Sequence, residues 1–225
     1  MRFDSVQLGT SDLPRAAGRY ADLLGTDPVE RTVDRVRFQL ARGAVELEPG
    51  EPGVRSIRFA LGGDAPPAGE DLCHGLTVHF DAPAHRTAPP PAPVGTITAI
   101  DHVVIHSPNL DRALRLWRDD FGVRLALDRD FPGRGLRMLF FRSGGVTLEF
   151  VSPLAPSDDP TAPDRFFGVA YRVRDLAACV HRLTAIGFDV SGVRPGHKSG
   201  TTVATVRSGL DGTPTLLIDD PSRDG

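Results

Sequence analysis

The chain has 225 residues, of which 40% are hydrophobic and 24% charged, an ordinary composition for a globular protein with one large or two small domains. Its net charge of −3 at pH 7 gives no reason to expect a nucleic-acid partner, which normally requires a basic face. No window reaches the length of a membrane span, and the N-terminus lacks the apolar core of a signal peptide. Two cysteines are too few for a disulfide framework. We therefore expect a cytoplasmic monomer or homodimer whose partner is a small molecule.

Residues 3–25 and 100–122 carry one sequence pattern twice. FDSVQLGTSDLPRAAGRYADLLG and IDHVVIHSPNLDRALRLWRDDFG align without a gap, with Ile100 on Phe3, a shift of 97 residues (100 − 3). The identical pairs include Asp4/Asp101, Val6/Val103, Arg15/Arg112 and Gly25/Gly122. A duplicated unit fixes the architecture before any single residue is interpreted. A residue present in only one copy is a candidate for function.

The N-terminal half continues with a weaker pattern. Arg55–Leu61 reads as the opening strand of a further copy, but no clear helix follows it, and only a short strand at 76–80 is expected. Residues 82–93, APAHRTAPPPAP, form a proline-rich connector that we expect to be extended and exposed. The second module of this half is therefore predicted to be truncated.

The next segment predicts a βαβββ unit. Val103–Ile105 is a strand core, and apolar residues at a spacing of three or four predict an amphipathic helix that ends at Gly122. Three strands follow, with a hairpin turn at Gly144-Gly145; they are expected at 123–127, 136–141 and 146–151.

A third copy begins near Gly168, with strands expected at 189–193, 202–206 and 215–218. The fold class is therefore α+β, with repeated βαβββ modules that form curved, cup-shaped mixed sheets. The expected organisation is an N-terminal half at 1–81, a linker at 82–97 and a complete two-module domain at 98–221.

The unit that opens with IDHVVIHSPNLDRALRLWRDDFG and closes on GGVTLEFV resembles the vicinal oxygen chelate superfamily. This group includes glyoxalase I, extradiol dioxygenases, methylmalonyl-CoA epimerase and bleomycin-resistance proteins. The stretch GVAYRVRDLAACVHRLTAIGFDVSGVRPGHKSGTTVATVRSGLDGTPTLLI looks most like the glyoxalase-like branch. The resemblance covers the C-terminal half and the N-terminal half through Leu61. It implies that two modules pair into a cup with the ligand inside.

The resemblance also implies a divalent metal, held by His or Glu side chains from the first and last strands of each module. His102 and Glu149 occupy two such positions, whereas Gly168 and a residue near Leu216 occupy the others and cannot bind a metal. Catalytic zinc sites usually have three protein ligands, so this set is incomplete. A His/carboxylate set suits Mn²⁺, Zn²⁺ or Ni²⁺. The candidates for a third ligand are His106, Glu46 and Glu48.

Strand alternation supports a site at His102 and Glu149 independently of the family. A buried imidazole and carboxylate in one cup are costly unless they meet each other, a metal or a ligand. Ser5 replaces His102 in the N-terminal copy, whose last strand offers Glu46 and Glu48 without a clean match to Glu149. The alternative is a core histidine bonded to Glu149 or to the backbone.

Four further residues are candidates for substrate contact. Arg172 shares a strand face with Gly168 and could anchor an anionic substrate or neutralise Glu149. Lys198, the single lysine of the chain, lies in a glycine-flanked cationic loop that could close over a carboxylate or phosphate, although a solvated hairpin explains it equally well. The other two candidates are His106 and Phe141, the latter as part of an apolar wall.

We therefore expect a glyoxalase-like protein that acts on a small carbonyl- or carboxylate-bearing metabolite by proton transfer of the isomerase, epimerase or lyase type, with His102 and Glu149 as catalytic residues. The alternative is a non-catalytic protein that binds an antibiotic or aromatic compound, which the incomplete metal set fits directly. An extradiol dioxygenase is disfavoured, because it requires a 2-His-1-carboxylate iron site.

Overall fold

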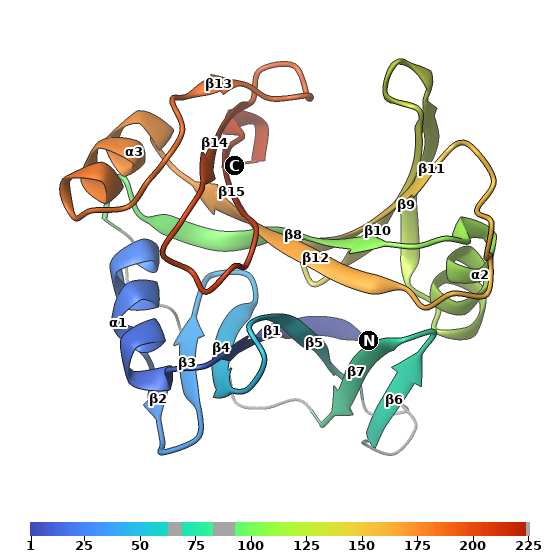
Figure 1. The fold of residues 1–225 in the computed structure, drawn as a ribbon, viewed down its shortest axis with the longest axis horizontal. Helices are drawn as coiled ribbons and strands as arrows, with labels where there is room; N and C mark the ends of the chain where they lie inside the picture. Colours follow the sequence, from blue (N-terminus) through green and yellow to red (C-terminus); the bar gives the residue numbers. More distant parts are fainter. Residues whose placement is uncertain (63–68, 83–92, 224–225) are drawn as a thin grey trace.

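The computed structural model describes residues 1–62, 69–82 and 93–223, which form two curved mixed sheets (Figure 1). The N-terminal sheet has the strand order β2-β3-β4-β1-β5-β7-β6, and the C-terminal sheet has the order β13-β14-β15-β12-β8-β11-β10-β9. The α+β class and the cup-shaped mixed sheets are thereby confirmed. The N-terminal strands are β1 Arg2–Thr10, β2 Glu30–Arg31, β3 Val36–Gln39, β4 Ala44–Pro49, β5 Gly53–Ala60, β6 Gly69–Cys73 and β7 Leu76–Asp81. The C-terminal strands are β8 Ile97–His106, β9 Arg124–Phe131, β10 Leu136–Ser143, β11 Val146–Pro153, β12 Arg165–Val173, β13 Arg194–Pro195, β14 Thr202–Val206 and β15 Thr215–Asp219.

Three helical segments follow the first strands of their modules. α1 spans Leu13–Leu24, begins at an Asp12 cap and ends at Gly25 in the left-handed conformation. α2 spans Leu110–Leu114 and continues as a π-helical turn, η1, over Arg115–Asp120. α3 spans Leu176–Ala185. The sequence predicts one regular helix at the second position, whereas the structure has a π-helical turn over its second part; Trp117 on this turn is fully buried in the core. Short 3₁₀ turns complete the list, η2 at Pro132–Arg134 and η3 at Pro221–Arg223.

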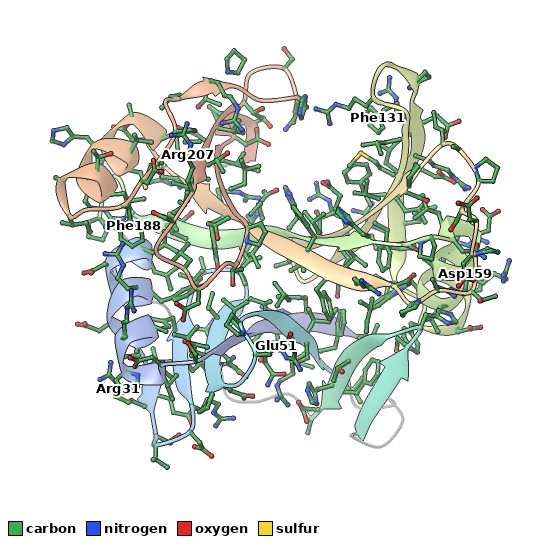
Figure 2. All side chains as sticks on the ribbon, viewed as in Figure 1. Arg31, Glu51, Phe131, Asp159, Phe188 and Arg207 are labelled. Atoms are coloured by element: carbon green, nitrogen blue, oxygen red, sulfur yellow. The ribbon has the colours of Figure 1, made fainter. Side chains whose placement is uncertain are left out.

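The two sheets pack with their convex faces toward each other, so that their concave faces point in opposite directions (Figure 1). An aromatic cluster fills the space between them: the Trp117 ring lies 5.8 Å from Phe59 of β5 and 5.7 Å from Phe150 of β11. Such rings bury large apolar areas and favour tilted or edge-on contacts. A second contact between the halves is made by the Arg19 guanidinium of α1, which lies 3.6 Å above the Phe188 ring. Phe188 follows α3 and lies near α1 (Figure 2).

The hairpin expected in the C-terminal half is present, whereas one expected strand is not formed. The strands at 136–143 and 146–153 are joined at Gly144-Gly145, both with positive φ (62° and 85°), as a tight hairpin requires. The strand expected at 189–193 is reduced to an isolated bridge between Val190 and Val206. Within the described residues, β6 is the only regular element between β5 and β7.

The domain boundaries stay a prediction. The N-terminal sheet ends at Asp81 and the C-terminal sheet begins at Ile97. Residues 83–92 of the expected connector, and residues 63–68 of the second module, lie outside the described residues. Among the described helices none is both long and apolar enough to cross a membrane.

Candidate functional site

The site lies on the concave face of the C-terminal sheet, here called the C-terminal cup. On β8, Val103 and Ile105 point into the core and have no exposed surface, so alternation directs His102, Val104 and His106 to the opposite face. β11 runs parallel to β8 with Thr147 opposite His102 and Glu149 opposite Val104.

His102 and Glu149 meet on this face. His102 Nε2 lies 3.8 Å from Glu149 Oε2, and their side chains are 13% and 17% exposed. This pair connects two strands far apart in sequence, and it is accessible from the cup. The structure thus brings together the two residues that the sequence selects as catalytic.

A β-bulge adds a second carboxylate. In the pairing of β8 with β12, Ala170 opposes His102 and Tyr171 opposes Ile100, which leaves Asp101 as an extra residue. A bulge of this kind re-aims a side chain, and Asp101 Oδ2 lies 3.0 Å from His102 Nδ1. Simple alternation predicts the opposite face for Asp101, so sequence reasoning missed it. The available signal is its identity with Asp4 in the first copy.

Asp101 also receives a hydrogen bond from Arg172 of β12, whose Nη2 donates to Oδ1 at 2.5 Å. Burial alone would raise the pKa of Asp101. The hydrogen bonds and positive charges of His102 and Arg172 outweigh burial and hold the pKa of this carboxyl well below its usual range. Because a carboxylate can only accept, His102 donates from Nδ1 to Asp101, and its Nε2 faces Glu149.

Arg172 therefore contacts Asp101 rather than the open part of the cup. Its side chain is 4% exposed. The sequence offered two roles for Arg172, an anchor for an anionic substrate and a counter-charge for Glu149. In the structure Arg172 instead neutralises Asp101, the carboxylate next to His102.

The remaining predicted residues lie apart from the His102–Glu149 pair. His106 is exposed on the same face of β8 and stacks on Phe167 with 4.6 Å between ring centroids. Phe141 points the other way, into the core, where it is fully buried edge-on against Phe150. Lys198 Nζ donates to Asp220 Oδ2 at 2.7 Å, in the loop before β14.

The N-terminal sheet has residues at the positions equivalent to Glu149 and Asp101. Glu46 opposes Gln7 on β1 as Glu149 opposes Val104 on β8, and Gln7 is the counterpart of Val104 at the 97-residue shift. Glu46 therefore corresponds to Glu149 in three dimensions, a match that the sequence left open. Asp4 occupies an equivalent bulge in β1.

The donor set in the C-terminal cup does not complete a metal site. Leu216 and Gly168 bring no ligand, and a side chain at 168 would meet Pro214 O at 2.4 Å from its Cβ. Across the described residues, no group of three or more His, Cys, Asp or Glu side chains is arranged to hold a metal ion. Two protein ligands fall short of the usual three, so we derive no step through a metal.

Comparisons with known proteins agree with this architecture. Residues 101–205 match the model of the Glyoxalase/Bleomycin resistance protein/Dioxygenase superfamily. The Mn(II)-bound glyoxalase from Novosphingobium aromaticivorans superposes with a TM-score of 0.74 and 20% identity, over 97% of this chain and 81% of that chain. The halotolerant catechol dioxygenase BphC gives a TM-score of 0.70 and 14% identity, over 97% and 86% of the two chains.

A third structure, homoprotocatechuate 2,3-dioxygenase from Arthrobacter globiformis, gives a TM-score of 0.68 and 13% identity, over 98% of this chain and 80% of that chain. No curated protein sequence matches the chain. At these identities the solved structures show a shared fold and leave the reaction to be argued from the site.

Proposed function

We propose that the C-terminal cup is an active site for proton transfer on a small carbonyl- or carboxylate-bearing metabolite, in keeping with the match of residues 101–205 to the model of the Glyoxalase/Bleomycin resistance protein/Dioxygenase superfamily. The observation that carries the proposal is the chain of contacts Arg172–Asp101–His102, which directs one imidazole nitrogen at Glu149.

His102 is suited to the role of general base. Asp101 holds the Nδ1–H tautomer and stabilises the imidazolium that forms when Nε2 accepts a proton from the substrate. Arg172 keeps Asp101 ionised, so the carboxylate is available to stabilise the imidazolium at neutral pH. General base catalysis contributes roughly 10²–10⁴-fold.

The 3.8 Å between His102 Nε2 and Glu149 Oε2 favours one kind of proton transfer. Two bases that invert a carbon lie on its opposite sides, each within hydrogen-bond reach, and are therefore roughly 6 Å apart. Here both groups meet the substrate from one side. The arrangement suits a shuttle in which a proton leaves one atom and returns to its neighbour, as in an isomerisation.

A second candidate function is ligand binding without chemistry. Apolar side chains border the cup: Phe167 is 48% exposed beside His106, and Leu127 of β9 is 42% exposed. Together with the incomplete donor set, this border favours a protein that sequesters an aromatic or antibiotic-like compound. A monomer or homodimer remains the expectation for its assembly.

Exchange of substrate hydrogen with solvent separates the two functions. The protein is incubated in D₂O with lactate, mandelate or glyceraldehyde, and loss of the proton signal is followed by ¹H NMR. We expect exchange with at least one of these compounds. His102→Asn and Glu149→Gln are each expected to lower its rate by about 10²-fold or more.

The matched controls are His181→Asn and Glu51→Gln, which change exposed residues outside the cup and should leave exchange unchanged. Binding of these compounds by the wild-type protein without any exchange would contradict catalysis and support the sequestering protein.

A further inference from the structure

Arg142 lies on the same row of the C-terminal cup as His102. The register pairs Arg142 with Thr147 and Thr147 with His102. On β10, Phe141 is fully buried in the core and Ser143 accepts a hydrogen bond from the Phe3 N–H of the other half. Alternation therefore directs Arg142 into the cup.

One residue separates Arg142 from His102 on this row. Two strand spacings lie between them, about 9–10 Å between backbones, and the residue between them is the short Thr147. An extended arginine side chain is long enough to span much of this distance. Glu149 is the diagonal neighbour of Arg142 across the β10–β11 pair.

Arg142 is a partly buried residue, and its guanidinium makes no hydrogen bond or ion pair within the described part of the chain. Its counterpart in the N-terminal sheet is Gln39, whose amide closes its own turn by donating to Leu40 O at 2.8 Å and Gly43 O at 3.1 Å. The unpaired cation is therefore specific to the half that carries His102. A partly desolvated guanidinium gains most from a bidentate anion.

From this placement we infer that Arg142 is the anion-binding residue of the C-terminal cup and that its ligand is a small carboxylic acid. The distance between Arg142 and His102 along this row sets the length of the ligand. Its carboxylate binds Arg142, and its reacting carbon, a few bonds away, faces His102 and Glu149. Phe140, which opposes Glu149 on the next row, gives the same ligand an apolar contact. The inference rests on the proposed function in placing the reacting carbon at His102.

Binding of matched probes tests the inference without turnover. Phenylacetate, phenylacetamide and phenylphosphonate share an apolar ring and differ in their polar group, and their Kd values are measured by calorimetry. We expect the wild-type protein to bind phenylacetate roughly 10- to 100-fold more tightly than phenylacetamide. Arg142→Met should abolish this preference, and Arg142→Lys should keep part of it.

The control is Arg115→Met, which removes an exposed arginine from η1 and should keep the full preference. A preference that survives in Arg142→Met overturns the inference, as does equal or undetectable binding of all three probes by the wild-type protein. Tighter binding of phenylphosphonate than of phenylacetate would contradict the assignment of the ligand as a carboxylic acid and indicate a phosphate ester instead. If the protein exchanges substrate hydrogen in D₂O but does not prefer phenylacetate to phenylacetamide, only the inference about Arg142 is contradicted. If it prefers phenylacetate but shows no exchange, only the proposed reaction is contradicted.

Discussion

The two concave faces of this protein start from one duplicated plan and hold their acidic residues in opposite ways. In the N-terminal sheet, Glu46 is 1% exposed and paired with Arg37, which also reaches Asp4 at 2.9 Å. In the C-terminal cup, Glu149 is 17% exposed and has His102 at 3.8 Å.

The difference arises on one row of the sheet. The register places Arg37 opposite Glu46 and Phe140 opposite Glu149. The N-terminal face gains further internal partners, because Gln7 Nε2 donates to Glu46 at 3.2 Å and the Ser56 hydroxyl donates to Gln7. A face whose charges are paired internally has little free energy to gain from a ligand. The C-terminal cup has more to gain, because Glu149 is more exposed there and Arg142 has no partner among the described residues.

The largest expected effect is on stability, and it contrasts the two arginines. Arg37→Met leaves the buried Asp4 without its cation and Glu46 with only the more distant Arg58, whose Nε lies 3.8 Å from Oε2, and is expected to cost about 3–5 kcal/mol of unfolding free energy. Arg142→Met removes a guanidinium that has no partner among the residues that the structure describes, and is expected to cost less than about 1 kcal/mol. Urea unfolding of both variants gives the comparison. Equal losses would break the distinction between the two faces.

Asp101→Asn should destabilise the protein by about 1–3 kcal/mol near neutral pH, because Arg172 and His102 lose a buried carboxylate. The folded pKa of Asp101 lies below its unfolded value of about 3.9. The stabilisation is therefore fully present above pH 4 and is lost as the pH falls through the folded pKa.

Urea midpoints of wild type and Asp101→Asn, measured at pH 6 and pH 3, check this dependence. The gap between them should narrow at the lower pH. A gap that widens there would mean that burial, rather than pairing, controls Asp101.

Phe140→Arg transplants the N-terminal arrangement into the C-terminal cup. The new guanidinium faces Glu149 across the β10–β11 pair, as Arg37 faces Glu46. We expect it to pair with Glu149 and to lower the proposed D₂O exchange by about tenfold or more, with a change in stability of about 1 kcal/mol at most. Phe140→Leu serves as the control for loss of the ring. Exchange at the wild-type rate in Phe140→Arg would show that Glu149 needs no open position.

Lys198→Ala has the smallest expected effect. Lys198 is 53% exposed and pairs with Asp220, and exposed ion pairs contribute less than about 1 kcal/mol. Thermal unfolding should shift by a few degrees at most. A larger shift would indicate that the loop before β14 holds the cup wall in place.

The sequence alone determined the repeated βαβββ plan, because apolar periodicity and the 97-residue repeat are local properties that survive without knowledge of the contacts. It also selected His102 and Glu149, because the family resemblance implies ligand positions at the first and last strands of a module; their common face follows from the register of β8 and β11. Asp101 and Phe141 needed the coordinates: a bulge reversed the expected face of the first, and the second turned out to point into the aromatic core.

Only the tertiary structure decided how the charges are paired. That Arg172 neutralises Asp101, that Glu46 corresponds to Glu149 and that Arg142 lies on the same row as His102 all follow from strand register. Register depends on bulges and turns that shift whole strands by one residue, and a one-residue shift exchanges the partners of every charge on a face. A linear sequence shows which charges exist, but their partners are set when the strands align.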